Sequence, residues 1–225
     1  MYLPRYFRGK VGTALALLEQ LGAAELITAT PAGPVTTFLP LLHQVAPDQE
    51  SRGQESAALG SLIGHVARAN DQWRVPALGQ ALVIARGPDF YVSPGWYAAK
   101  AEHGRVVPTW NYLTAHFRGR LVIHDDPEWL EDVVRRLTEH HEAGQLHPWS
   151  IDDAPRRYID GMLAAIVGIE VVLEQIDVKA KLSQNRSPAD IAGVVAGLEL
   201  ANDPEAVEQM RQAQRSTLPR TPGNG

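Results

Sequence analysis

The sequence predicts a mainly β protein, a small barrel with flanking helices. Several short strand-like segments are separated by turn residues, and the 225 residues include 19 Gly and 16 Pro, which is more than a typical domain carries. Helical patterns gather instead near the two ends of the chain. Short strands bounded by turns, with helices outside them, are typical of such a barrel.

The first part of the chain predicts a helix and a hairpin. Leucines at three-residue spacing predict an amphipathic helix over Val11–Leu21, which Gly22 ends in the C′ position. Strand patterns follow at 25–30 and 35–42, with a Pro- and Gly-containing turn between them. Because Pro40 cannot donate a ladder hydrogen bond, we expect the second strand to lie at an edge or to bulge there.

The middle of the chain predicts more strands and a well-marked helix. The strand-like segments are 62–67, 80–86, 89–93, 106–116 and 121–124. The last two are separated by Arg118-Gly-Arg120, which we interpret as a break. Asp126-Pro127-Glu128 combines a carboxylate N-cap, a proline at the first helical position and an acid in the first turn, so a helix begins there.

The last part predicts a helix over 155–165, a long strand over 167–181 and helical residues over 187–215. The simplest organisation is one domain over 1–186, a C-terminal helical extension over 187–215 packed on that domain, and a flexible tail over 216–225.

Composition excludes several classes of function. The chain has no Cys, which excludes thiolate catalysis, iron–sulfur clusters and disulfide scaffolds. Its eight His residues show no metal-ligand spacing, so we expect no metal. The formal net charge of −5 argues against a surface coated with nucleic acid, although a local basic patch is compatible with it. Without a membrane helix or secretory signal in the pattern, we expect a cytoplasmic protein.

Two segments carry the side chains that a flavin mononucleotide (FMN) needs. Residues 91–112 hold aromatic, hydroxyl, amide and Lys side chains, and residues 179–186 crowd Lys, Ser, Gln, Asn and Arg at the end of an apolar strand. A phosphate binds cations and hydroxyls, the flavin edge binds amides, and its rings bind apolar walls. Period-two alternation places Thr109 and Asn111 on one face of their strand, with Trp110 and Tyr112 on the other.

Five motifs lie in order along the chain: GHVARAN at 64–70, GPDFYVSPGWY at 87–97, VPTWNY at 107–112, PW at 148–149 and KLSQNR at 181–186. Together they resemble the PaiB family of FMN-binding negative transcriptional regulators, over nearly the whole folded chain. The resemblance implies an FMN-binding split barrel of six strands with Greek-key-like topology. It also implies a homodimer with flavin at the interface.

Site roles follow from joining this resemblance to side-chain chemistry. The phosphate candidates are Arg68, Ser93 and Lys100, with a structural ion pair as the alternative role for Arg68. The candidate walls of the ring system are Trp96, Tyr97, Trp110 and Tyr112, each of which is equally suited to core packing. Thr109 and Asn111 are assigned to ring or ribityl oxygens. The remaining candidates would reach across the dimer: Gln184, Asn185 and Arg186.

Two positions depart from the family pattern. Phe38 stands where the family usually has His, and Gly95 stands where it usually has Ser. Three functions therefore stay open: a flavin-binding regulator, an FMN-dependent oxidoreductase or flavin reductase, and a barrel that has become an interaction module without flavin.

The sequence also predicts the partners of the chain. A homodimer is expected, with an interface above about 2,000 Å², because the long apolar strand offers more surface than one subunit readily buries. Nucleic acid is expected to bind only weakly or indirectly. The candidate helix–turn–helix over 188–214 contains five acids and one Arg, whereas a recognition helix should be basic.

Overall fold

The computed structural model describes residues 1–45 and 59–217, so nearly all of the predicted tail lies outside the described residues. The chain forms two compact units. Unit 1 comprises Met1–Lys10, Arg86–Thr114 and Val178–Gly225, and unit 2 comprises Val11–Ala85 and Ala115–Asp177. This division does not follow the boundary that we drew at residue 186, so the one-domain organisation stays a prediction.

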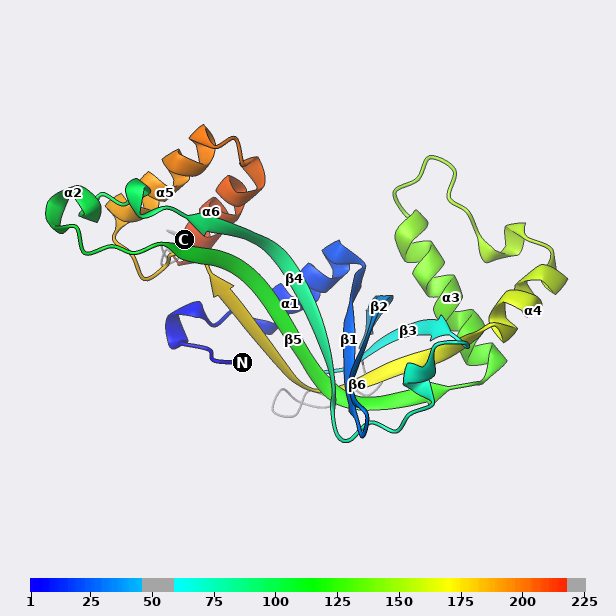
Figure 1. Ribbon diagram of the computed structural model, residues 1–225. Coiled ribbons are helices and arrows are strands. Elements are labelled where there is room, and N and C mark those ends of the chain that lie inside the picture. The colour runs from blue at the N-terminus through cyan, green and yellow to red at the C-terminus, as the bar shows by residue number, and fades with distance from the viewer. Residues whose placement is uncertain (46–58, 218–225) are drawn as a thin grey trace, which may run out of the picture. The chain divides into compact units, whose positions relative to one another are not determined.

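Six strands form a closed barrel in the order β1-β2-β3-β6-β5-β4 (Figure 1). Their bounds are β1 Ala23–Thr30, β2 Gly33–Gln44, β3 Ser61–Ala67, β4 Ala81–Val92, β5 Thr109–His124 and β6 Ile166–Lys181. The predicted fold class, mainly β with six barrel strands and flanking helices, is confirmed. The strands β4, β5 and β6 each contribute residues to both units.

Helices flank the strands within each unit. Those of unit 2 are α1 Val11–Leu21, α3 Pro127–Glu142 and α4 Arg156–Ala164, and those of unit 1 are α2 Ala99–His103, α5 Pro188–Leu200 and α6 Pro204–Thr217. The predicted N-terminal helix is confirmed at both ends. The predicted start of α3 is also confirmed, because Asp126 accepts a hydrogen bond from the backbone N–H of Glu128.

The hairpin of unit 2 explains how a proline fits within the barrel. β1 pairs with β2 from Thr30 opposite Gly33 to Ala23 opposite Pro40. β3 joins β2 on its other side only from Leu41 onward. Pro40 therefore lies just outside the second ladder, where no backbone donor is needed. We expected β2 to be an edge strand, but it pairs with β1 on one side and β3 on the other. Pro40 lies just before the part of β2 that pairs with β3.

A buried amide holds the same hairpin from inside. Gln72, in the 3₁₀ turn η3 Asp71–Trp73, is 3% exposed and donates to the Thr28 hydroxyl (3.1 Å) and to the carbonyl oxygens of Leu26 and Val35 (both 3.3 Å). It accepts a bond from Thr37, whose hydroxyl also accepts one from Asn70. This network satisfies the buried polar groups of unit 2 between β1 and β2.

Two predicted strand breaks are wrong. β4 runs unbroken through residues 87–88, and β5 runs unbroken through Arg118-Gly-Arg120. Gly119 stays in the strand because the neighbouring strand approaches its backbone: a Cβ there would lie 2.0 Å from the carbonyl oxygen of Val172. The glycine thus marks a close contact between strands rather than a turn.

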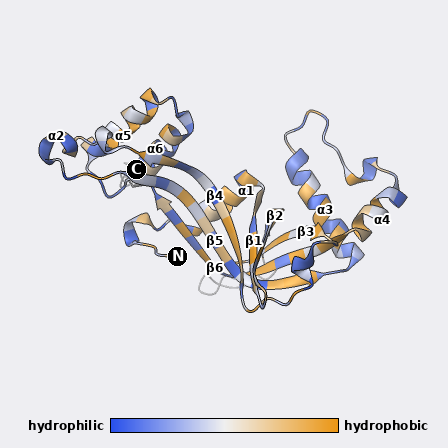
Figure 2. Ribbon diagram, viewed as in Figure 1, coloured by the Kyte–Doolittle hydropathy of each residue, from blue (hydrophilic) through white to orange (hydrophobic). Residues whose placement is uncertain are grey.

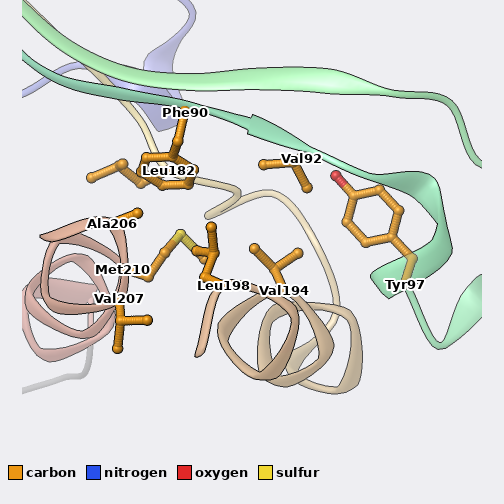
Figure 3. Packing of buried hydrophobic residues seen from close by; sticks show 9 residues of the cluster. All are labelled: Phe90, Val92, Tyr97, Leu182, Val194, Leu198, Ala206, Val207 and Met210. Atoms are coloured by element: carbon orange, nitrogen blue, oxygen red, sulfur yellow. The ribbon is translucent and has the colours of Figure 1, made fainter. Parts of the chain in front are cut away.

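Unit 1 has its own hydrophobic core, formed where the ends of β4 and β6 meet α5 and α6 (Figure 3). Its buried members are Phe90, Val92, Tyr97, Leu182, Val194, Leu198, Ala206, Val207 and Met210. The hydropathy colouring shows how elements differ: β3 is mainly hydrophobic, whereas the short helix α2 is hydrophilic (Figure 2). The helical residues predicted over 187–215 are confirmed as two helices whose apolar sides fill this core.

Candidate functional site

Eleven of the twelve candidate site residues belong to unit 1. They come from the end of β4 with the turn after it, from the start of β5, and from the loop that follows β6. The exception, Arg68, belongs to unit 2. The fold therefore gathers into one unit residues that are separated by about a hundred positions in the sequence.

Arg68 is engaged within unit 2. Its guanidinium forms a forked pair with the Asp125 carboxylate and donates to the carbonyl oxygens of Ala164 (2.8 Å) and Ile166 (3.0 Å). The hydrogen bond from Arg68 lowers the pKa of the Asp125 carboxyl. These bonds occupy the fork that a phosphate would need, which favours the structural alternative. A phosphate role for Arg68 stays a prediction.

The turn after β4 forms a small polar group. Ser93 caps the 3₁₀ turn η4 Pro94–Trp96 by accepting a hydrogen bond from the Gly95 N–H (3.1 Å). A Cβ at Gly95 would lie 3.2 Å from the Ser93 hydroxyl and 3.9 Å from the Lys100 ammonium, with no other contact within 4 Å. The hydroxyl and the ammonium thus lie near each other at this turn. A hydroxyl beside a cation is a combination that binds anions.

The aromatic side chains of η4 face the C-terminal helices. Trp96 lies against Gly197 of α5, where a Cβ would come within 2.3 Å of the indole ring. Tyr97 is 3% exposed and belongs to the core of unit 1, and the guanidinium carbon of Arg186 lies 4.6 Å from the centroid of its ring. Both aromatics therefore pack as structural groups, and Arg186 covers Tyr97 by a cation–π contact.

The Tyr97 hydroxyl is a buried polar group without a hydrogen-bond partner among the described residues. It points toward the strand that carries Val92 (Figure 3). An unpaired buried hydroxyl forgoes its bonds to water, at a cost of about 1–3 kcal/mol. Natural cores seldom keep such a group, and its presence next to the candidate residues is compatible with a ligand contact.

We expect Tyr97→Phe to raise the free energy of unfolding by about 1 kcal/mol, because it removes the unpaired hydroxyl and keeps the ring under Arg186. Urea unfolding monitored by circular dichroism measures this. Asn111→Ala in the same unit should have the opposite effect and lower the free energy of unfolding. It leaves the buried Ser183 hydroxyl without its hydrogen-bond partner. A destabilised Tyr97→Phe would mean that the hydroxyl has a partner in solution.

Two predicted amide ligands are used inside unit 1. Asn111 is fully buried and donates to the Ser183 hydroxyl (2.9 Å). Gln184 accepts from the Leu182 N–H (2.7 Å) and donates to the Ala180 carbonyl (2.6 Å), closing its own turn. Asn185 is exposed, with no side-chain hydrogen bond among the described residues. Of these three amides, Asn185 is the one available to a ligand or a partner subunit.

Lys179, Lys181 and Arg186 lie close enough on unit 1 for the charges of Lys179 and Arg186 to act on Lys181, without a neutralising carboxylate among the described residues. The ammonium of Lys181 is held by the Thr109 hydroxyl and by the Trp110 carbonyl (2.8 Å). Burial lowers the pKa of Lys181, and the charges of Lys179 and Arg186 lower it further, against an opposing effect of Tyr112. Among the described residues, no carboxylate lies within ion-pairing distance of these three side chains. Such a cluster is a site for an anion.

The sheet face on which Lys179 and Lys181 lie is aromatic. Ala180 and Leu182 pack toward α5 and α6, so the alternating lysines point to the other face. The Lys179 ammonium lies 5.4 Å from the ring centroid of Tyr112, and Trp110 is 48% exposed. The predicted alternation along β5 agrees with buried Asn111, which contacts Met210 of α6, and with exposed Trp110, whereas the Thr109 hydroxyl bonds Lys181 instead of sharing the surroundings of Asn111.

The predicted site does not include Lys179 and Lys181, although both lie in the predicted segment 179–186. Period-two alternation was the available signal, since residues 179 and 181 must share a face at the end of a strand. Only the fold shows that Arg186 acts on Lys181 and that the Tyr112 ring lies next to Lys179.

Comparisons with known proteins identify relatives for nearly the whole chain. A family model described as "Putative FMN-binding domain" matches residues 1–175. The "Protease synthase and sporulation protein PAI 2" of Bacillus subtilis is 30% identical over 222 residues, covering 97% of this chain and 98% of that protein.

Solved structures share the fold at low sequence identity. A conserved hypothetical protein, Rv2991, from Mycobacterium tuberculosis aligns with a TM-score of 0.53 at 13% identity, covering 83% of this chain and 94% of that one. An FAD- and heme-binding protein from Mycobacterium smegmatis aligns with a TM-score of 0.51 at 14% identity, covering 82% and 78%. In the part of the chain that the structure describes, no helix is long and apolar enough to cross a membrane.

Proposed function

We propose that this chain, which belongs to the family of FMN-binding domains whose model matches residues 1–175, holds FMN on unit 1 at the cluster of Lys179, Lys181 and Arg186. These three residues lie beyond the matched range, so their part in the proposal rests on the side chains alone. The chain is a flavin-binding protein that resembles PaiB. The observation that carries the proposed site is the cation cluster itself. It has no carboxylate partner among the described residues, and it borders aromatic side chains.

The chemistry of these residues fits FMN. The phosphate is a dianion that takes charge-assisted hydrogen bonds from Lys and Arg, and the ring system takes aromatic or apolar neighbours. Lys181, already oriented by Thr109 and Trp110, is pre-arranged for the phosphate. Trp110 and Tyr112 supply the aromatic surface. When bound, FMN supplies hydride and single-electron chemistry, while the protein binds and orients it.

The turn with Ser93 and Lys100 is retained as the second part of the proposed site. Lys100 is exposed and Ser93 is half-buried, and Asn185 adds an available amide. Thr109 acts through Lys181. The remaining candidates in unit 1, among them Trp96, Tyr97, Asn111 and Gln184, support the site by fixing the strand ends and the loop after β6.

We expect saturable quenching of flavin fluorescence when FMN is titrated with micromolar protein, together with a flavin absorbance spectrum of the complex. Riboflavin should bind at least about tenfold more weakly, because it lacks the phosphate that the cations recognise. Titrations of both flavins in the same buffer test this. Equal affinities would move the phosphate away from the cation cluster, and absence of quenching by either flavin would contradict flavin binding.

The biological role of flavin binding is proposed from the resemblance to the PaiB family. The PaiB resemblance favours negative regulation of transcription in the cytoplasm. An FMN-dependent reductase is distinguished by steady-state oxidation of NAD(P)H with added FMN, because hydride transfer to flavin needs no acid–base pair.

A homodimer is proposed on different grounds from those of the sequence. Val167, Ile169 and Val171 of the long strand are at most 1% exposed inside unit 2, so they offer no surface to a partner. Exposed apolar side chains such as Phe38 (67%) and Leu78 (66%), both in unit 2, are the better support. Light scattering at micromolar concentration tests the dimer, and a monomeric mass would contradict it.

A further inference from the structure

The charges of unit 1 are segregated. Residues 1–10, 86–114 and 178–187 contain nine Lys and Arg against two Asp and Glu, whereas the helical residues 188–215 contain two against five. Of the nine cations, Arg86 alone forms an ion pair with a carboxylate among the described residues. The part of unit 1 outside its C-terminal helices is therefore strongly basic, although the whole chain carries −5.

Several of these cations share the sheet face opposite α5 and α6. Arg8 forms an antiparallel bridge with Lys179, so the two side chains lie on one face of the sheet. Arg8 is exposed. The Lys179 ammonium lies 5.7 Å from the ring centroid of Tyr2, which belongs to the same N-terminal segment. The cation cluster is thus extended by Arg8 along the strand.

Exposed aromatic rings lie on the same face. Tyr91 alternates with Phe90 and Val92, which are buried against the helices, so its ring faces away from them. It is 47% exposed and lies 6.2 Å from the Trp110 ring, centroid to centroid. Tyr2 is 82% exposed. The Trp110 indole N–H donates to the Asp89 carboxylate (2.9 Å), whose charge is paired with Arg86. Exposed rings on the same face as unpaired cations are the elements of a surface on which bases stack and phosphates bind.

We propose that this face, made of Tyr2, Arg8, Tyr91, Trp110, Lys179 and Lys181, binds single-stranded nucleic acid. The proposal goes beyond FMN binding, because one phosphate dianion needs fewer cations than the face presents and does not account for Arg8 or Tyr2. Bases with exposed π-faces match the rings, and a chain of phosphates matches the row of cations. Lys179 and Lys181 also belong to the proposed flavin site, so the two ligands should compete.

The test uses the full-length, flavin-free protein and fluorescence anisotropy of labelled 20-nucleotide single strands, DNA and RNA, with the duplex as a comparison. Three phosphate contacts, by Arg8, Lys179 and Lys181, predict a slope of log K against log salt near −2, at about −0.7 per contact. Arg8→Gln should reduce the slope by about 0.7, and Trp110→Ala should weaken binding about tenfold through lost stacking. Arg215→Gln, which removes a charge from α6, is the matched control and should change neither the salt slope nor the affinity.

Arg8→Gln also separates this proposal from the flavin proposal, because it should leave the FMN affinity unchanged. Binding of single strands without competition by FMN would uphold the nucleic-acid face and move the flavin elsewhere. The proposal is overturned if single strands bind no tighter than about 10⁻⁴ M at physiological salt, the weak limit of non-specific binding. It is equally overturned if Arg8→Gln and Trp110→Ala bind like the unmodified chain, or if anionic vesicles bind in preference to single strands.

Discussion

Replacing Lys181 with Gln is expected to weaken FMN binding by about 10- to 100-fold, the range of a lost charge-assisted hydrogen bond of about 1.5–3 kcal/mol. Lys181 is the cation whose position the fold defines most closely, since its ammonium contacts both Thr109 and the Trp110 carbonyl. The substitution removes the charge from the centre of the cluster and keeps a side chain of similar length. Titration of flavin fluorescence measures the two dissociation constants.

Riboflavin is the control for this result, because a ligand without phosphate should bind Lys181→Gln and the unmodified protein alike. Lys100→Ala is the parallel variant at the turn, and a loss of similar size there would place the phosphate at Ser93 and Lys100. If Lys181→Gln binds FMN as tightly as the unmodified chain, the phosphate does not lie at the cation cluster. A loss of folding is detected independently by circular dichroism.

Sequence patterns group the candidate residues into segments but do not predict which contacts their side chains make. Asn111 looks like a ligand in an alternating strand, yet its amide is taken by Ser183, which lies 72 positions away. Gln184 looks like an arm, yet it bonds its own turn. Which polar side chain pairs internally depends on neighbours brought together by the fold, and no local pattern contains that information.

The net charge of the chain likewise does not show how charge is distributed over its surface. A net charge of −5 and the acidic residues of 188–214 argued against nucleic acid, and the acidic character of those helices is unchanged by the structure. The basic residues are concentrated in three separate segments that meet only in unit 1. Charge on a surface depends on which segments are neighbours, so composition alone cannot describe it.

Elements defined by local chemistry were predicted closely. The helix Val11–Leu21 and the start of α3 follow from spacing, a glycine stop and a capping carboxylate, all of which act within a few residues. The failures at residues 87–88 and 118–120 concern Gly and Pro inside long strands. Glycine serves turns and close backbone contacts equally well, and only the neighbouring strand decides between them.

Gly119 provides the second prediction with a large effect. We expect Gly119→Ala to lower the free energy of unfolding by about 3 kcal/mol, because the new methyl group would meet the Val172 carbonyl oxygen at 2.0 Å and the Leu173 Cα at 3.0 Å. These are backbone atoms of the adjacent strand β6, which cannot move aside as a flexible side chain can. The corresponding fall in the melting temperature is roughly 6–12 °C for a chain of this size.

Gly161→Ala is the matched control, because the chemical change is identical and the surroundings are not. Gly161 lies within α4, and a Cβ there meets no atom within 4 Å. Alanine is favoured over glycine in a helix interior by about 1 kcal/mol, so this variant should melt about 2–4 °C higher than the unmodified protein. If the close approach of β6 is the reason for glycine at position 119, calorimetry should show a lower melting temperature for Gly119→Ala and a higher one for Gly161→Ala. A Gly119→Ala protein that melts with the unmodified chain would show that β5 and β6 separate enough there to admit a side chain, and Gly119 would then be a flexible point in the strand.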